Sequence, residues 1–145
     1  MNSFYSEEEL RCLGLRAYGE DVLISRNASI YGAGRLTIGD HVRIDDFCIL
    51  SGEIYLHNYI HLAAGTMLLA GDAGITLEDY TTTSSNCRLY AVSDDYSGRT
   101  MTNPMIPEEY KELVQGPIIL RRHVVIGTGC TLLPGVEVGE GVSVG

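Results

Sequence analysis

Aliphatic side chains recur every six residues along most of this chain. The recurrence runs from Ile38 to Leu68, resumes from Leu77 to Leu89 and again from Leu120 to Val144, and only Thr83 in these runs is not aliphatic. A helix repeats about every 3.6 residues and an amphipathic strand every two, so neither generates this period. A period of six predicts a solenoid, in which short parallel strands stack coil upon coil and bury their aliphatic residues between them.

The turns group three six-residue units into one coil. Polar or glycine-containing turns begin at residues 38, 56, 77, 120 and 138, which are 18 residues apart except at two insertions. The first insertion adds three residues between Leu68 and Leu77, and the second adds twenty-five between Leu89 and Leu120. We therefore expect an all-β triangular prism in which both insertions lie against each other at one corner. Loops on a rigid scaffold often carry the functional site.

The same pattern predicts one domain over residues 1–145. It consists of an N-terminal cap over 1–19 and coils over 20–145, with an inserted loop over 93–117. Repeat proteins need polar caps at their ends. Because the chain stops at Gly145, one residue into a hexad, we expect a solenoid that is truncated at its C-terminus.

Two short helices are expected outside the coils. Ser6 and Glu9 form a capping box, which predicts a helix over residues 7–13 that covers the first coil. In the long insertion, Pro107 suits a first helical position and Gly116 suits the position after a helix end. The segment between them predicts a helix of one or two turns.

Composition narrows the range of partners. The 145 residues include ten lysines and arginines against nineteen aspartates and glutamates, and the net charge of −9 repels nucleic acid and anionic bilayers. No apolar run is long enough for membrane insertion, and the N-terminus lacks the basic and apolar regions of a signal peptide, so we expect a cytoplasmic protein. The four cysteines form no CxxC and no zinc-ligand spacing, which predicts reduced thiols and no metal.

Three hexads carry the pattern of a known family. In IGDHVR, IGTGCT and VGEGVS, glycine follows an aliphatic residue and a small or apolar residue stands at the fifth place. The chain thereby resembles the hexapeptide-repeat acyltransferases, in particular the galactoside and maltose O-acetyltransferases. The resemblance implies a left-handed parallel β-helix, a homotrimer, acetyl-CoA as the acyl donor and a saccharide as the acceptor.

The catalytic base is the position at which the sequence departs from this family. Acyl transfer to a hydroxyl needs a base for the proton and donors for the oxyanion of the tetrahedral intermediate. The resembled enzymes place a histidine after the last strand before the long loop, where this chain has Asp94 and Asp95. Aspartate titrates near about pH 4, and the pair equally suits a turn at the surface. His61 falls where the family has an acceptor-site aromatic residue, and we expect it to be the base, with Asp94 and Asp95 orienting the acceptor or the loop.

Further ligand-binding positions follow from the same resemblance. Four residues in or above the acceptor site are expected to bind the substrate: Asp72, Thr82, Ser84 and Tyr96. Three residues of the later coils are expected to contact coenzyme A, although plain turn and strand roles fit them equally well: Val125, Gly127 and Thr128.

The other histidines and the cysteines have structural interpretations. Four rings share the fourth place of a hexad on one edge and predict a ladder on the outside of the prism: His41, Tyr59, Tyr80 and His123. Three cysteines share one place on another edge and predict buried thiols in the interior: Cys48, Cys87 and Cys130.

The function that these residues favour is a homotrimeric, acetyl-CoA-dependent O-acetyltransferase that acts on a saccharide hydroxyl in surface polysaccharide biosynthesis. Three alternatives stay open. N-acetylation of an amino sugar requires the same fold and the same donor. A metal hydratase of the γ-carbonic-anhydrase type would need three histidine ligands; His57 and His61 could be two of them, but their spacing differs from that family's and no third is evident. A scaffold without catalytic activity would account for the missing histidine.

Overall fold

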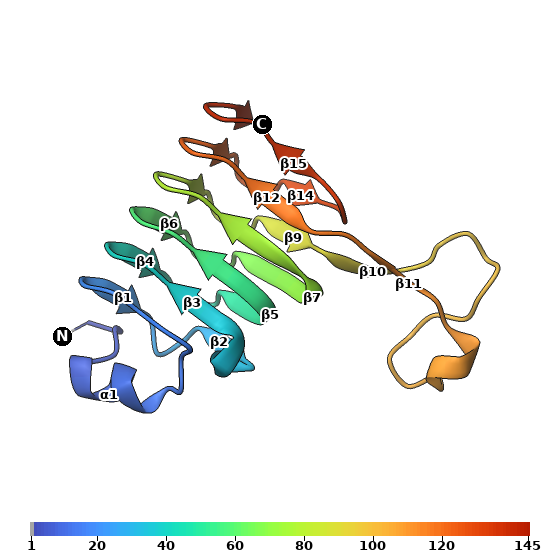
Figure 1. Ribbon diagram of the computed structural model, residues 1–145, viewed down its shortest axis with the longest axis horizontal. Helices are drawn as coiled ribbons and strands as arrows, with labels where there is room; N and C mark the ends of the chain where they lie inside the picture. Colours follow the sequence, from blue (N-terminus) through green and yellow to red (C-terminus); the bar gives the residue numbers. More distant parts are fainter. Residues whose placement is uncertain (1) are drawn as a thin grey trace.

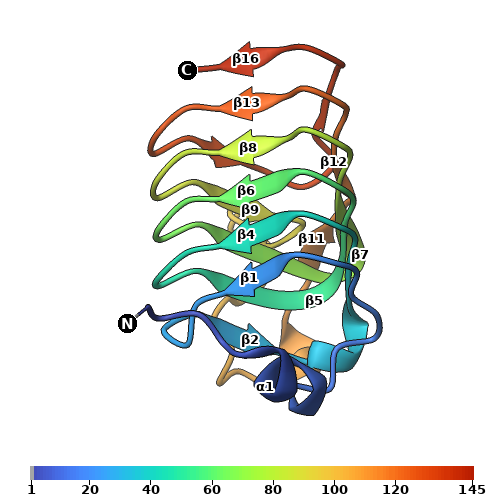
Figure 2. The same ribbon diagram turned by 90° about the vertical axis from the view of Figure 1, so that its left-hand side faces the viewer.

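The computed structural model describes residues 2–145, which wind into a parallel β-solenoid with a helix at one end (Figure 1). Residues 92–115 project from one side of the solenoid and are called the arm below. The first face of the solenoid is a six-stranded parallel sheet, seen from the front in Figure 2. Its strands, in spatial order, are β1 (Val22–Ile24), β4 (Val42–Ile44), β6 (Ile60–Leu62), β8 (Thr82–Thr83), β13 (Val125–Ile126) and β16 (Ser143–Val144).

The second and third faces are continuous because β5 (Ile49–Leu56) and β7 (Met67–Leu77) run round the corner between them. The second face is completed by β2 (Ser29–Tyr31), β9 (Arg88–Tyr90) and β14 (Thr131–Leu132). The third face is completed by β3 (Leu36–Ile38), β12 (Ile118–Leu120) and β15 (Glu137–Val138), and a turn of 3-10 helix, η1 (Ala33–Arg35), precedes β3. This arrangement confirms the predicted triangular β-helix.

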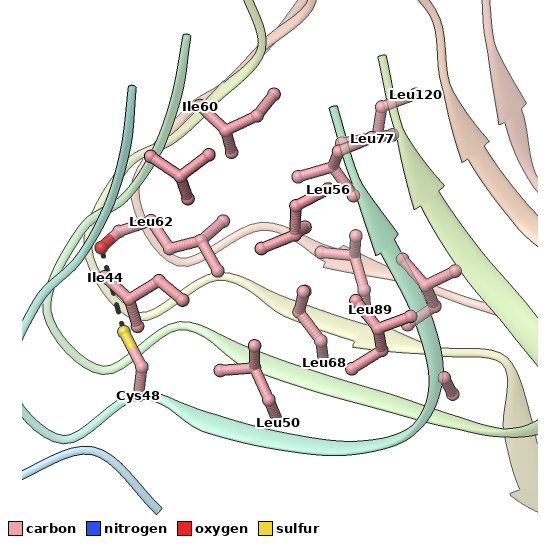
Figure 3. Packing of buried hydrophobic residues seen from close by; sticks show 14 of the residues in the cluster. Ile44, Cys48, Leu50, Leu56, Ile60, Leu62, Leu68, Leu77, Leu89 and Leu120 are labelled. Carbon is pink, nitrogen blue, oxygen red and sulfur yellow. Dashed lines mark hydrogen bonds between the residues drawn. The ribbon is translucent and has the colours of Figure 1, made fainter. Parts of the chain in front are cut away.

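The interior is built from the six-residue period. Ile44, Leu62, Thr83 and Ile126 lie in register on successive coils of the first face, and all four are buried. Figure 3 shows Ile44 and Leu62 pointing into the interior among the other aliphatic side chains. Each buried aliphatic side chain contributes roughly 1.5–3 kcal/mol relative to exposure. Thr83 fits among them because its hydroxyl and that of Thr66 are 3.0 Å apart and hydrogen bond to each other, so that neither is left unpaired.

The N-terminal helix α1 (Glu7–Cys12) closes the first coil, as predicted. The Ser6 hydroxyl accepts a hydrogen bond from the backbone N–H of Glu9, the first half of the predicted capping box, and donates one to the Glu9 carboxylate. The helix buries Leu10 in the core cluster. The polar remainder of α1 faces water and ends the apolar interior at this side.

The predicted ladder of rings is present at the corner between the third and first faces. His41, Tyr59, Tyr80 and His123 stack with centroid separations of 4.7, 5.1 and 4.8 Å. All four have φ values between 58° and 63°, a left-handed conformation that non-glycine residues seldom adopt. The stack therefore offsets part of the strain of a tight corner and is a structural element.

Both insertions meet at the corner between the second and third faces, as predicted. Gly52 and Gly71 stack there with φ values of 93° and 53°, and Val92 lies directly over Gly71. The long insertion leaves this corner as an antiparallel hairpin, β10 (Val92–Asp94) paired with β11 (Leu113–Gln115), which projects from the prism (Figure 1).

The prediction of a helix between Pro107 and Gly116 is mostly wrong. Only one turn of 3-10 helix, η2 (Glu108–Tyr110), forms, and the chain then enters β11. The three residues of β11 pair with Val92, Ser93 and Asp94, so their backbone groups bond across the hairpin instead of along a helix. Pairing with a distant segment, which the local pattern does not reveal, overrides the helical signal.

Candidate functional site

His61 projects from the outer surface of the first face on β6. It lies in register with Arg43 on one side and with Thr82 on the other, which confirms the predicted placement of Thr82 one coil above. Its Nε2 atom is 2.8 Å from Oδ2 of Asp45, and 41% of the side chain is exposed. The carboxylate favours the tautomer with the proton on Nε2, which leaves Nδ1 able to accept a proton.

Asp45 is the partner that sequence reasoning missed. Burial opposes ionisation of this carboxyl group, but hydrogen bonds from Arg43 and His61 outweigh that effect and lower its pKa. The Arg43 Nε–Asp45 Oδ1 distance is 2.7 Å. The spacing held a signal for this cluster, since Arg43 stands one 18-residue coil before His61 and Asp45 follows two residues later. A strand places residues two apart on the same side.

The predicted coenzyme residues lie farther along the same face. Val125 is in register with Thr82, and its side chain is 41% exposed. Ser84 and Gly127 follow β8 and β13 at equivalent places, where their N–H groups donate to Ile126 and Val144. A side chain at 127 would meet the Val144 carbonyl oxygen at 2.9 Å, so close coil stacking alone requires a glycine here. Thr128 is exposed at the next turn.

A pocket of about 350 Å³ lies at the base of the arm. The half-buried Asp94 and the exposed Tyr96 contribute to its wall. The other lining residues come from the second face and the start of the hairpin and are mostly apolar: Leu69, Tyr90, Val92, Ser93, Thr131 and Leu133. This is a carboxylate in largely apolar surroundings, an arrangement suited to holding a cationic or proton-donating group.

Asp95 and Asp72 are engaged in local interactions. Asp95 accepts hydrogen bonds from the N–H and the hydroxyl of Ser97, both at 2.9 Å, and these lower its pKa. The result is the turn that the sequence offered as the alternative for this pair. Asp72 is highly exposed and forms an ion pair with Arg35 at 2.8 Å beside Gly71. That ion pair anchors the corner from which the arm departs.

The predicted site residues thus fall into two groups within one chain. His61, Thr82, Ser84 and the three coenzyme candidates belong to the first face and the corner that follows it. Asp72, Asp94, Asp95 and Tyr96 belong to the next corner and to the arm. The whole second face separates the groups, as Figures 1 and 2 show together.

The cysteines are poor candidates for chemistry. Cys48 and Cys87 are fully buried as predicted, and burial raises the pKa of both thiols, that of Cys48 to about 11. The prediction is wrong for Cys130, which is only partly buried because it precedes β14, the last strand of the second face. A thiol with a raised pKa is a weak nucleophile. Within residues 2–145 no group of three or more histidine, cysteine, aspartate and glutamate side chains could hold a metal ion. No helix in this range is long and apolar enough to cross a membrane.

The coil repeat defines a hexapeptide-repeat protein, and comparison with known proteins identifies which family of these proteins the chain belongs to. No protein-family model matches the chain. A dTDP-4-amino-4,6-dideoxy-D-glucose acyltransferase of Escherichia coli is 39% identical over 146 residues, which cover 99% of this chain and 76% of that enzyme. The chain therefore belongs to the hexapeptide-repeat sugar acyltransferases, which use acyl-CoA donors, and this confirms the family predicted from the hexads.

AntD, an N-acyltransferase from Bacillus cereus, has been solved in complex with dTDP-4-amino-4,6-dideoxyglucose and coenzyme A. It is 48% identical to this chain, with a TM-score of 0.98 over 100% of this chain and 78% of AntD. That form carries the substitution S84C, and other solved forms carry S84A, S84T, D94A and D94N. WbbJ of Escherichia coli K12, provisionally named a lipopolysaccharide biosynthesis O-acetyl transferase, is 26% identical over 84% of this chain and 62% of WbbJ.

Proposed function

We propose that this protein transfers an acyl group from coenzyme A to the amine of a nucleotide-linked 4-amino-4,6-dideoxy sugar. An amine replaces the hydroxyl that the sequence favoured as the acceptor, so the product is an amide. The observation that carries the proposal is a carboxylate, Asp94, in a largely apolar pocket beside the arm. The likeness to AntD over the whole chain supports it, and the two AntD residues replaced in the solved forms, a serine numbered 84 and an aspartate numbered 94, have the same type and number in this chain.

An aspartate suits an amine better than it suits a hydroxyl. A sugar amine resembles an α-amino group, which titrates near about pH 8, and is largely an ammonium ion at neutral pH. The ion pairs with a carboxylate, and the gap of about four pKa units that opposes its deprotonation is far smaller than the gap for a sugar hydroxyl. A hydroxyl gives up its proton far less readily and needs a histidine or a stronger base. The departure from the O-acetyltransferase pattern at Asp94 is therefore the change expected for an amine acceptor.

The transfer step balances without a further reactant. The ammonium ion first loses a proton, for which Asp94 is the nearest base in the pocket. The free amine then attacks the thioester carbonyl carbon, the C–N bond forms and the C–S bond breaks. The second nitrogen proton ends on the departing sulfur, a group that titrates near about pH 8.5 as a thiol. We assign the path of the coenzyme to Val125, Gly127 and Thr128 on the first face.

A homotrimer is part of this proposal, because one chain holds the two groups of site residues on different faces. In a ring of copies, the arm of one copy can reach the first face of its neighbour and bring Asp94 close to His61 and Ser84. The arm carries exposed apolar side chains that such a contact would cover, among them Met105, which is 87% exposed, and Val114, which is 47% exposed.

The proposal is tested by incubating the protein with dTDP-4-amino-4,6-dideoxyglucose and either acetyl-CoA or 3-hydroxybutyryl-CoA. We expect the mass of the nucleotide sugar to rise by one acyl group and the product to survive mild alkali, because an amide resists the treatment that cleaves an ester. The control acceptor is the same nucleotide sugar with a hydroxyl in place of the amine. An alkali-labile product, or equal turnover of the hydroxyl control, would return the function to O-acylation.

A further inference from the structure

The second face carries an apolar row on its outer side, where the solenoid meets water. Leu69 and Tyr90 are in register on β7 and β9, and Leu133 follows Leu132, whose partner is the residue before Tyr90. Their neighbours Leu68, Leu89 and Leu132 point into the core, so the row points outward. Leu133 is 54% exposed.

Leu69, Tyr90 and Leu133 of this row line one pocket together with Asp94 of the arm. Val92 and Asp94 are two residues apart on β10 and project to the same side of the strand. Besides Asp94, the polar groups of the wall are the hydroxyls of Tyr90, Ser93, Tyr96 and Thr131. The Ser93 hydroxyl donates to the backbone carbonyl of Asp94 at 3.1 Å, and Thr131 on β14 precedes Leu133 by two residues. A ligand that places a charged nitrogen on Asp94 therefore has the hydrocarbon of Val92 beside it, with Leu133 in the same wall.

This asymmetry matches the chemistry of one class of sugar. In a 4-amino-4,6-dideoxy sugar the amine is on C4, and the methyl group C6 is on C5, the adjacent ring carbon. A 6-hydroxy sugar would place a hydroxyl group against the same hydrocarbon, where its hydrogen bonds to water would be lost without replacement.

On the basis of the proposed function, we infer that the wall formed by Val92 and Leu133 binds the C6 methyl group and selects 6-deoxy sugars over 6-hydroxy sugars. Discrimination by an apolar pocket against an added hydroxyl amounts to about 10- to 100-fold in kcat/KM. The acceptor specificity of the enzyme thus lies in one side chain of the second face, Leu133, and one of β10, Val92, and not in the carboxylate that takes the amine.

The test compares dTDP-4-amino-4,6-dideoxyglucose with dTDP-4-amino-4-deoxyglucose as acceptors, and measures both kcat/KM and the dissociation constant by calorimetry without an acyl donor. We expect a preference of about 10- to 100-fold for the 6-deoxy sugar in the natural protein. Leu133→Ser and the nearly isosteric Val92→Thr should each reduce that preference several-fold. Tyr31→Ser is the matched control, since Tyr31 is in the same outer row, two coils away and outside the pocket.

Three results would overturn the inference: equal use and equal binding of the two sugars by the natural protein, an unchanged preference in both variants, or the same loss of preference in Tyr31→Ser. A change in the ratio of 3-hydroxybutyryl to acetyl transfer, with the sugar preference intact, would assign the wall to the acyl chain instead. The binding measurement separates this inference from the proposed function. Absence of acyl transfer to either sugar contradicts the function, whereas the ratio of dissociation constants still decides the role of the wall.

Discussion

Asp94 and Asp95 are adjacent in sequence, yet their carboxylates have different surroundings. The Asp95 side chain accepts two hydrogen bonds from Ser97 and closes a turn at the start of the loop. The Asp94 side chain lines the pocket at the base of the arm. Sequence alone could not separate the two, because the difference depends on the pairing of β10 with β11.

This difference predicts unequal effects of the same substitution. Asp94→Asn should lower kcat by about 10²–10⁴, the usual contribution of a general base, while Asp95→Asn should change kcat by a few-fold at most. Both variants keep the size of the side chain, and both should keep the affinity for coenzyme A, measured by calorimetry. His61→Asn should cost less than Asp94→Asn for an amine acceptor. If His61→Asn abolishes turnover while Asp94→Asn is nearly silent, the base is His61, as the sequence first suggested.

Prediction from the sequence was strongest where a residue belongs to the repeat. The register of Thr82 above His61, the stacked rings and the burial of Cys48 and Cys87 all follow from counting hexads. Asp45 could have been found in the same way, because it directly follows β4, the strand one coil before His61. The apolar row beside Asp94 could not, since Leu133 and Val92 are brought together only by the hairpin.

At the scale of the element, the arm depends on the glycine corner from which it departs. Gly71 has a φ of 53°, and a Cβ at this position would lie 2.2 Å from Cγ2 of Val92, the first residue of β10. Small to large changes in a packed site typically cost about 1–3 kcal/mol, in addition to the cost of a left-handed conformation for alanine.

Gly71→Ala should therefore destabilise the fold and displace the arm. The matched control is Gly129→Ala, because Gly129 has a similar φ of 75° and nothing within 4 Å of its would-be Cβ. We expect urea denaturation to give a lower free energy of unfolding for Gly71→Ala than for the control, by about 1–3 kcal/mol. The acceptor KM should rise only in Gly71→Ala. Equal losses in the two variants would mean that Val92 moves aside without cost.

At the scale of the whole molecule, a chain of ion pairs links the N-terminal coils to the corner from which the arm departs. Glu53 is 2.6 Å from Arg16 and 3.3 Å from Arg35, and Arg35 also pairs with Asp72. The hydrogen bond from Arg16 is the largest cause that lowers the pKa of Glu53, to about 2. An unfolded glutamate titrates near about pH 4.3, so this contribution to stability is complete above that pH and is lost as the pH falls towards 2.

Acid sensitivity of the fold should accordingly decrease when Glu53 is neutralised. The fall in Tm between pH 5 and pH 2.5 should be smaller in Glu53→Gln than in the natural protein, while Tm at pH 7 should be lower in the variant. Glu140→Gln, a change at an exposed turn glutamate, is the control and should follow the natural protein. Parallel acid curves for all three proteins would show that the ion pairs contribute nothing measurable to stability.

Asp94 and the proposed coenzyme path on the first face lie far apart within one chain. We therefore expect two inactive variants, one altered at each place, to complement each other in a mixed oligomer. Asp94→Asn removes the acceptor carboxylate, and Val125→Glu places a negative charge on the proposed path of the anionic coenzyme, so each variant alone should be nearly inactive. If each site takes Asp94 from one copy and Val125 from the next, refolding the two variants together at equal amounts creates intact sites. Random assembly into a closed ring should restore about one quarter of the natural activity. Recovery no greater than the sum of the two separate variants would place the whole site within one chain.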